Sequence, residues 1–553
     1  MFKYFGKTED NTTTVEAGEQ SSIEGLVKPL DKGYKDLGYI SATGLILNRI
    51  IGTGIFATPS TIVLLLNGSI GLALVMWVVG SIIALSGMYV YMEFGSAIPR
   101  NGGEKNYLEY VYGKPRFFVT AMYAAYVFFL GWASGNSIVF GQYILQAAGV
   151  ESTRWSERGL GIAAISFAFL VNGTHIKTGA YLQNILGLFK IGVVLFICIT
   201  GFVGLGGWKK TDNFNHSFKG ASGATAYGVV NALYNIIWSF VGYSNANYAL
   251  GEMKNPVKTL KFAAPIALVT LAIIYFFVNV AYFAIVPLDT LQHSSTILAA
   301  DFFDIAFGKT ARRASSVFVA LSALGNVMSV IFSQGRIIQA LGREGILPFP
   351  KFFATSRPFN SPFIGLFQHW VVCVITIVAP PPGDAYNFIM NLISYPLNIV
   401  NLFVAIGLLY LNIQHRRNKL VWTPPIRASI PVIIFFGLAS LYLVVAPYIP
   451  PSAGQSVYND LPYYVHCVTA WGIFGLGAVY WLFWAKILPK LFGYKLHIEE
   501  VIGEDGFWRK EVKRIKLDDY ANYMAEQGSQ DNVDVDLELH ETNVKSSDKS
   551  VIS

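Results

Sequence analysis

The stretch Ile50-Ile51-Gly52-Thr53-Gly54-Ile55-Phe56 lies in the middle of an apolar run that extends from about Tyr39 to Leu66. The length of this run predicts a membrane-spanning helix, but each glycine inside a helix costs about 1 kcal/mol relative to alanine. Unpaired backbone groups at bilayer depth are tolerated only where protein or water lines them. The stretch therefore predicts a broken helix with a ligand site at the break, although glycines of this kind also serve close helix packing.

The backbone freed by such a break favours an anionic ligand. Gly52 and Gly54 have no side chain, so a small ligand can approach the amides around Thr53. These amides would lie at the N-terminus of the half-helix that begins near Ile55, and helix N-termini attract negative charge. A carboxylate is the expected guest.

The composition places the chain among multi-pass membrane proteins. Of its 553 residues, 53% are hydrophobic, 15% are aromatic and only 14% are charged, which excludes an ordinary soluble protein. Roughly twelve apolar runs, each about 20 residues long, lie between Tyr39 and Leu488, which excludes a single-span receptor. The net charge of +7 is spread over the loops between these runs, so it indicates membrane orientation rather than nucleic-acid binding.

The predicted fold class is an all-α polytopic membrane protein with about 12 transmembrane helices, arranged as a five-plus-five inverted repeat with discontinuous helices 1 and 6, plus two extra helices. The expected domains are a disordered N-terminal tail (1–38), a transport core (39–411, with repeats 39–206 and 226–411), two additional transmembrane helices (429–489) and a C-terminal tail (490–553). Lys and Arg are more frequent in the loops that face inward if both tails are cytosolic. In this orientation Asn215, in the sequon Asn215-His216-Ser217, is the glycosylation candidate.

A second interruption supports the repeat. The stretch from Trp238 to Asn247 places a glycine and several polar residues inside the apolar run that opens the second group of five spans. Helix interruptions at corresponding places in two halves indicate the substrate site of an inverted-repeat transporter. The sequence thus favours a transporter over a pair of inert packed helices.

The residues around both interruptions resemble the amino acid-polyamine-organocation superfamily. Its first-helix signature is similar to the stretch Ile50–Pro59, and two further motifs are similar to Pro99–Glu104 and Gly251–Pro256. The resemblance covers about Gly38 to Leu411 and is greatest to the L-type amino acid transporter branch; Asn48-Arg49 is similar to the fungal high-affinity methionine permeases. It implies a secondary active transporter that imports a neutral L-amino acid, with methionine as the expected substrate, across the plasma membrane by proton symport.

The resemblance also implies a set of substrate contacts. The amides around Gly52, Thr53 and Gly54 would hold the carboxylate of a zwitterionic amino acid. Its ammonium would be held by the carbonyls of Ile50, Trp238 and Val241. The side-chain subsite would be formed by Gly135, Val139, Trp238 and Tyr243. Trp238 departs from the gating Phe that is common in L-type relatives, which leaves substrate size open, and packing against core or lipid is the alternative for this indole.

Ionisable residues at membrane depth indicate function by default. Lys190 lies in the middle of the fifth span and resembles the lysine that occupies the place of a sodium ion in sodium-independent relatives. It would be either a fixed cation or the carrier of the coupling proton. Arg49 lies nearer the cytosolic mouth, where extension of its side chain to water is the alternative, and Glu93 is a candidate partner for it.

Other functions lack a sequence signal. The chain has no phosphate-binding loop, no zinc-ligand spacing and no nucleophile with a nearby base, so we expect no enzyme activity, no cofactor and no metal. The expected partners are an amino acid, protons and the lipid bilayer, with the cytosolic tails binding trafficking or ubiquitin-ligase machinery. Two alternatives use the same binding site: an amino-acid-sensing receptor without net transport, and a broad neutral amino-acid exchanger.

Overall fold

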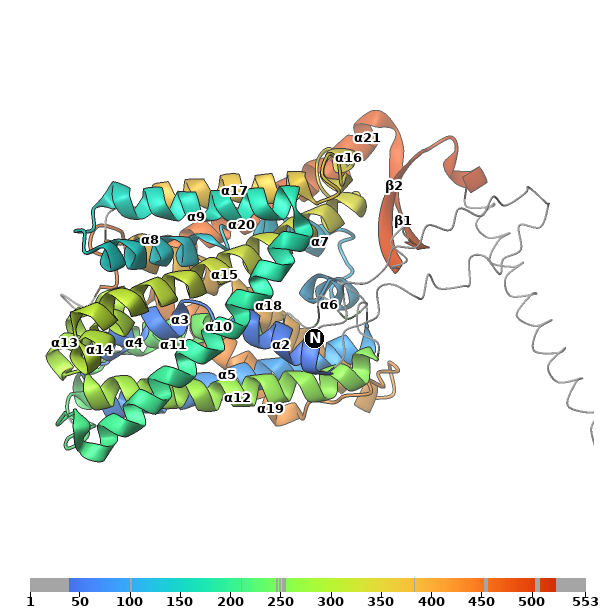
Figure 1. The fold of residues 1–553 in the computed structure, drawn as a ribbon. Helices are drawn as coiled ribbons and strands as arrows, with labels where there is room; N and C mark the ends of the chain where they lie inside the picture. The colour runs from blue at the N-terminus through green and yellow to red at the C-terminus, as the bar shows by residue number, and fades with distance from the viewer. Residues whose placement is uncertain are drawn as a thin grey trace, which may run out of the picture.

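The computed structural model describes residues 39–99, 102–209, 211–244, 247, 250, 255–381, 383–451, 456–502 and 508–523. The predicted N-terminal tail, residues 100 and 101 of the second motif and residues 251–254 of the third lie outside these ranges. Within them the chain forms a bundle of long helices with one β-hairpin at the C-terminal side (Figure 1).

The first half of the chain consists of the helices α2 (Tyr39–Ile50), α3 (Gly54–Ala57), α4 (Pro59–Leu65), α5 (Ile70–Ala97), α6 (Glu104–Val111), α7 (Phe118–Phe129), α8 (Ser134–Ala148), α9 (Arg154–Thr174) and α10 (Ile176–Val203). The second half continues with α11 (Ala226–Phe240), α12 (Pro256–Ile285), α13 (Leu288–His293), α14 (Leu298–Phe307), α15 (Lys309–Arg343), α16 (Pro350–Ala354), α17 (Phe363–Val378) and α18 (Ala385–Arg416). The chain then forms α19 (Ile430–Val445), α20 (Val465–Trp481) and α21 (Leu488–Phe492).

Many of these helices match the membrane in length and polarity. Among the described residues, eight helices are long and apolar enough to cross a bilayer, and a ninth span is added if the bent pair Ala42–Ala57 and Pro59–Leu65 counts as one. The two parts of that pair meet at 52°. α17 is a shorter apolar helix. Large apolar side chains such as Leu188, 74% exposed, cover the outside of the bundle, as expected for a surface that faces lipid.

Three of the spans in the described part of the chain are interrupted. α2 ends at Ile50 and α3 begins at Gly54, and α11 ends at Phe240, where Val241 becomes extended; both interruptions were predicted. The third lies between α7 and α8, where Leu130 is extended (φ −93°, ψ 131°). The sequence predicted discontinuous helices only at positions 1 and 6, so this last break is a correction.

The C-terminal region contains a β-hairpin that the all-α prediction omitted. β1 (Tyr494–Ile502) pairs antiparallel with β2 (Trp508–Lys516), with Tyr494 opposite Lys516. Figure 1 shows the hairpin beyond one end of the bundle, near α6 and α16, whereas α13 and α14 lie at the opposite end. We call these the hairpin end and the far end. The hairpin contacts α15, because the amide of Val512 donates to the carbonyl of Glu344 over 2.9 Å.

Candidate substrate site

The two predicted breaks lie in direct contact with each other. A β-carbon added at Gly54 would lie 2.5 Å from Oγ and 2.7 Å from Cα of Ser239, in the last turn of α11. Gly242, in the second break, has φ +119°, and a β-carbon there would lie 2.8 Å from Cγ of Arg49. Real β-carbons do not approach other atoms this closely, so the absence of side chains at these two positions is what allows the broken helices to meet.

A small cavity lies at this meeting point. It is lined by Arg49, Ile50, Gly52, Thr53, Gly54, Trp132, Asn136, Trp238, Val241, Asn326 and Val330. Its volume is about 20 Å³, which is little more than one water molecule needs. An amino acid therefore fits only if the walls of the cavity move apart.

Seven of the predicted residues line this cavity, namely Arg49, Ile50, Gly52, Thr53, Gly54, Trp238 and Val241. The other three predicted subsite residues do not. A β-carbon at Gly135 would lie 3.3 Å from Cζ2 of Trp238, so Gly135 lies directly behind that indole. Val139 is buried one turn further along α8, and Tyr243 packs edge to face on Tyr91 with ring centroids 5.9 Å apart.

The cavity also contains a polar connection that sequence reasoning missed. The hydroxyl of Thr53 donates to Oδ1 of Asn136 over 2.7 Å, and the amide of Thr53 donates to the same atom over 3.3 Å. Nδ2 of Asn136 in turn donates to Oδ1 of Asn326 over 3.0 Å, and Nδ2 of Asn326 donates to the carbonyl of Arg49 over 3.1 Å. These two asparagines link α8 and α15 to both sides of the first break.

Side chains from three other helices bind the carbonyls at the end of α2. Nζ of Lys190 donates to the carbonyls of Asn48 (2.9 Å) and Ile51 (2.8 Å), and the hydroxyl of Tyr275 donates to the carbonyl of Ile50 (3.2 Å). With the Asn326 contact to Arg49, all four successive carbonyls have a donor. A helix end leaves its last carbonyls without intrahelical partners, and inside a membrane those partners must come from the protein. Lys190, which is fully buried, thus holds the break in place.

The amides on the other side of the break are not engaged in this way. Within the described residues, the backbone N–H groups of Gly52, Gly54 and Ile55 have no hydrogen-bond acceptor. Gly52 and Gly54 both line the cavity. An unpaired buried amide is costly, so the two at the cavity and the third on the next residue are suited to an anionic ligand group.

Glu93 has partners other than the predicted Arg49. This carboxylate is fully buried in α5 and accepts hydrogen bonds from Nδ2 of Asn412 (2.9 Å), Nε1 of Trp422 (2.8 Å) and the amide of Ala428 (2.8 Å). All three donors belong to the end of α18 or to the connection from α18 to α19. Glu93 therefore fastens that connection to α5, whereas Arg49 lies at the cavity.

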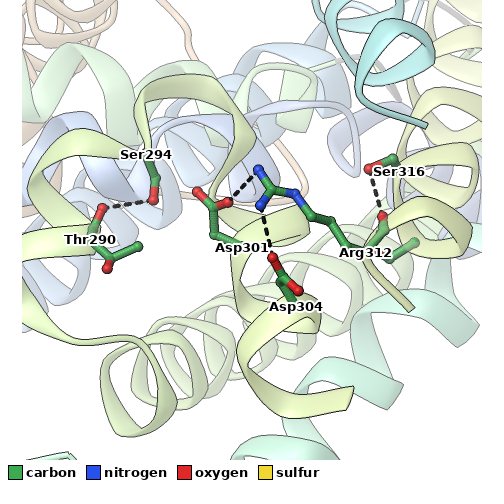
Figure 2. A network of polar contacts seen from close by, with 7 residues as sticks. Thr290, Ser294, Asp301, Asp304, Arg312 and Ser316 are labelled. Atoms are coloured by element: carbon green, nitrogen blue, oxygen red, sulfur yellow. Dashed lines mark hydrogen bonds and ion pairs between the residues drawn. The ribbon is translucent and has the colours of Figure 1, made fainter. Parts of the chain in front are cut away.

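An ion-pair network connects two helices at the far end of the bundle (Figure 2). The guanidinium of Arg312, in α15, binds Asp301 (3.0 Å) and Asp304 (2.8 Å) of α14. Burial raises the pKa of Asp301, and the hydroxyl of Ser294 and the charge of Arg312 act against that shift. Nearby, Ser294 donates to the carbonyl of Thr290 over 2.7 Å, which closes the turn that leads into α14.

A second ion pair lies at the hairpin end. Lys105, in α6, pairs with Glu344 at the end of α15 and with Glu109 over 3.4 Å. Burial alone would lower the pKa of Lys105, but the two carboxylates raise it above its ordinary value, so the ammonium stays charged. This pair connects α6 to the residue whose carbonyl binds the hairpin.

The glycosylation candidate lies on the surface. Asn215 is exposed, and its side chain donates to Oδ1 of Asp212 over 2.9 Å. The loop that carries it packs on the turn between α4 and α5, where the amide of Gly71 donates to the carbonyl of Ser217 over 2.6 Å. The asparagine is thus accessible in the folded chain.

Comparison with known proteins agrees with this geometry. The family model for amino acid permeases matches residues 37–473. The chain is 60% identical to the high-affinity methionine permease of Saccharomyces cerevisiae over 92% of its own length and 88% of that protein. It is 30% identical to the low-affinity methionine permease of the same yeast, over 84% of each chain. It is 28% identical to the human b(0,+)-type amino acid transporter 1, over 80% of this chain and 88% of the relative.

The match to the family model includes both predicted breaks, the cavity between them and the apolar helices that surround it. With identity this high over nearly the whole chain, the resemblance seen in the sequence is confirmed. The chain belongs to the amino acid permease family and is a multi-pass membrane protein that imports amino acids.

Proposed function

We propose that this protein imports L-methionine across the plasma membrane by proton symport. The observation that carries the proposal is the 60% identity to a yeast protein named as a high-affinity methionine permease. A second yeast relative is also named as a methionine permease, although it shares only 30% identity.

We propose the following architecture for the transporter. About 12 spans form a five-plus-five inverted repeat (39–206 and 226–411) with two further helices in 429–489, and both termini are cytosolic. The support comes from the breaks in α2–α3 and after α11, which open the two halves and touch through Gly54 and Ser239. Interrupted helices at corresponding positions of two repeats are typical of alternating-access transporters.

The proposed site binds the two charges of the zwitterion on opposite sides of the first break. The carboxylate accepts from the amides of Gly52, Gly54 and Ile55, which have no acceptor in the described part of the chain. The ammonium donates to the carbonyls of Ile50, Trp238 and Val241. Ile50 and Trp238 already accept one hydrogen bond each, from Tyr275 and from the amide of Val241, and a carbonyl oxygen has a second lone pair for another donor.

The substrate side chain lies against the indole of Trp238 in this proposal. Gly135 lies behind that indole, so the ring cannot move toward α8 without displacing the helix backbone. An apolar wall of this kind accepts a thioether or an aliphatic chain and excludes a charged one, because burying an unpaired charge is costly. The proposed substrate is therefore an amino acid with a neutral side chain.

We propose that Lys190 supplies a fixed positive charge at the place of a coupling cation. Its two hydrogen bonds to the carbonyls of Asn48 and Ile51 support this role. A role as the carrier of the proton is also compatible with these contacts, because the neutral amine keeps two N–H donors for the two carbonyls. Replacement of Lys190 separates the two roles.

The test is uptake by the purified protein in lipid vesicles. We expect radiolabelled L-methionine to accumulate when the outside is acidic, to be displaced by excess unlabelled methionine and to be displaced poorly by lysine or glutamate. Specific binding without flux would instead identify a receptor. Uptake that needs methionine inside the vesicle and ignores the pH gradient would identify an exchanger.

A further inference from the structure

The unpredicted break in the third span brings a tryptophan to the cavity. Between α7 and α8, residues 130–133 leave the helical path, and Trp132 at this point lines the cavity. A β-carbon at Gly131 would lie 2.6 Å from Oγ of Ser134 and 2.7 Å from Oγ1 of Thr376, so the chain is tightly packed behind the break. Trp132 is therefore held in the cavity wall.

The indole of Trp132 contains a donor that the described residues leave unpaired. The side chain is only 8% exposed, and its Nε1 has no hydrogen-bond acceptor among them. The ring of Tyr126 packs edge to face against the indole, with ring centroids 5.3 Å apart. Buried indole N–H groups normally have a partner, so an unpaired one on a residue that lines a ligand cavity is available to an acceptor from the ligand once the cavity opens.

The position of Trp132 assigns this donor to the side-chain end of the substrate. Gly135 follows three residues later and lies behind Trp238, the indole proposed to contact the substrate side chain. The amides proposed for the carboxylate belong to the first break instead. Trp132 and Trp238 line the same cavity, and we assign both to the side-chain end of the substrate.

We propose that Trp132 determines specificity by donating its indole N–H to the sulfur atom of a thioether side chain. This inference rests on the proposed function, because it requires methionine to bind in this cavity. A thioether sulfur is a weak hydrogen-bond acceptor, whereas a hydrocarbon chain of the same length has no acceptor atom. Methionine can therefore pair the buried N–H, whereas norleucine leaves it unpaired.

The test compares methionine with norleucine, in which a methylene replaces the sulfur. Because the sulfur is a weak acceptor, a hydrogen bond at the weak end of the usual range predicts a KM for methionine about two to five times lower than for norleucine in the wild-type protein. The Trp132→Phe variant keeps an aromatic ring but removes the donor, so the ratio of the two KM values falls to about one. Both substrates are measured by uptake into vesicles and by mutual competition.

Trp77→Phe is the matched control. Trp77, in α5, is also buried and its Nε1 also lacks an acceptor in the described part of the chain, but it packs on Phe240 and Tyr275 and does not line the cavity. This variant should lower stability while leaving the ratio of methionine to norleucine at its wild-type value. A change in ratio in both variants would indicate a general packing effect and overturn the proposal.

Two further outcomes would also overturn it. Equal KM values for methionine and norleucine in the wild-type protein would do so without any variant, which covers the case in which Trp132→Phe fails to fold. If Trp132→Phe keeps the wild-type ratio of the KM values for methionine and norleucine, the preference for methionine comes from another residue. Failure of the proposed function looks different, because the wild-type protein would then transport neither substrate.

Discussion

Gly54 and Ser239 come from the two broken helices and lie so close together that a β-carbon on Gly54 would be 2.7 Å from Cα of Ser239. The atom that blocks this space belongs to the backbone, so a change of rotamer cannot relieve the clash. The contact fixes the separation between α3 and α11, and with it the shape of the cavity that both helices line.

Gly54→Ala should therefore abolish methionine uptake while the protein remains in the membrane. The added methyl group forces the two helices apart, at a cost of about 1–3 kcal/mol for overpacking a tight contact. Gly44→Ala, in α2, is the control, because a β-carbon there meets no described atom within 4 Å and should leave uptake unchanged. Normal affinity and uptake in the Gly54→Ala variant would show that this contact is not needed for transport.

Asn136 and Asn326 should act as a unit. Asn136→Ala leaves the hydroxyl of Thr53 without its acceptor, and Asn326→Ala leaves the carbonyl of Arg49 without its donor. Each should raise the KM for methionine, and the double variant should be less impaired than the sum of the two, with a coupling of about 0.5–3 kcal/mol. Asn398→Ala is the control, because among the described residues that side chain bonds only to the carbonyl of Ser394, within α18. If the effects of the two single substitutions on KM simply added in the double variant, the two asparagines would not act as a unit.

Lys190→Met should lose accumulation of methionine against a gradient. Removal of the ammonium leaves the carbonyls of Asn48 and Ile51 without this donor, at about 1–3 kcal/mol for each buried group. If the charge is only structural, Lys190→Arg should retain part of the activity, limited by the backbone of Gly325, because a β-carbon there would lie 3.3 Å from Cε of the lysine. If Lys190 carries the proton, arginine should fail as well, because it does not deprotonate.

The measurement for Lys190 is paired uptake and exchange in vesicles, with the exposed Lys219→Met as control. Methionine-for-methionine exchange that survives in the Lys190→Met variant, without net accumulation, would assign the lysine to proton coupling. Accumulation at the wild-type rate would refute both roles.

Trp238→Phe should broaden selectivity toward larger neutral amino acids. The smaller ring enlarges the subsite, and a change of this size in an apolar pocket is worth about 1–3 kcal/mol. Competition of methionine uptake by phenylalanine and tryptophan should improve in this variant but not in Trp155→Phe, where the side chain is 64% exposed. An unaltered competition profile would place Trp238 outside the subsite.

The sequence predicted those parts of the fold that have a strong local signal. The breaks at Gly52–Gly54 and after Phe240 were visible because glycines and polar residues interrupt long apolar runs, and Lys190 was visible because a charge in such a run is rare. Each of these features is a residue type that is unfavourable inside a membrane-spanning helix, so it can be recognised from the local sequence. Such local features do not indicate which helices pack against each other.

The parts that were missed depend on contacts between distant segments. Asn136 and Asn326 are single polar residues in different spans, and only the packing of α8 on α15 gives them a common role. The break at Leu130–Ala133 did have a signal, because it is followed directly by the small and polar residues Ser134-Gly135-Asn136-Ser137, but the prediction did not use it. The donors that bind Glu93 come from residues more than 300 positions later, so the sequence does not show them. The hairpin did have a signal, since Lys495–Glu499 alternates between polar and apolar residues as strands do.

The account rests most heavily on the claim that the substrate binds where the broken helices meet. The most direct test is the anomalous scattering of selenium in crystals of the wild-type protein grown with L-selenomethionine, a substrate analogue in which selenium replaces sulfur. The prediction is one strong selenium peak in the cavity, between Trp132 and Trp238, with the carboxylate of the ligand at the amides of Gly52 and Gly54. A peak elsewhere in the bundle, with the cavity between Gly54 and Trp238 unchanged, would contradict the account.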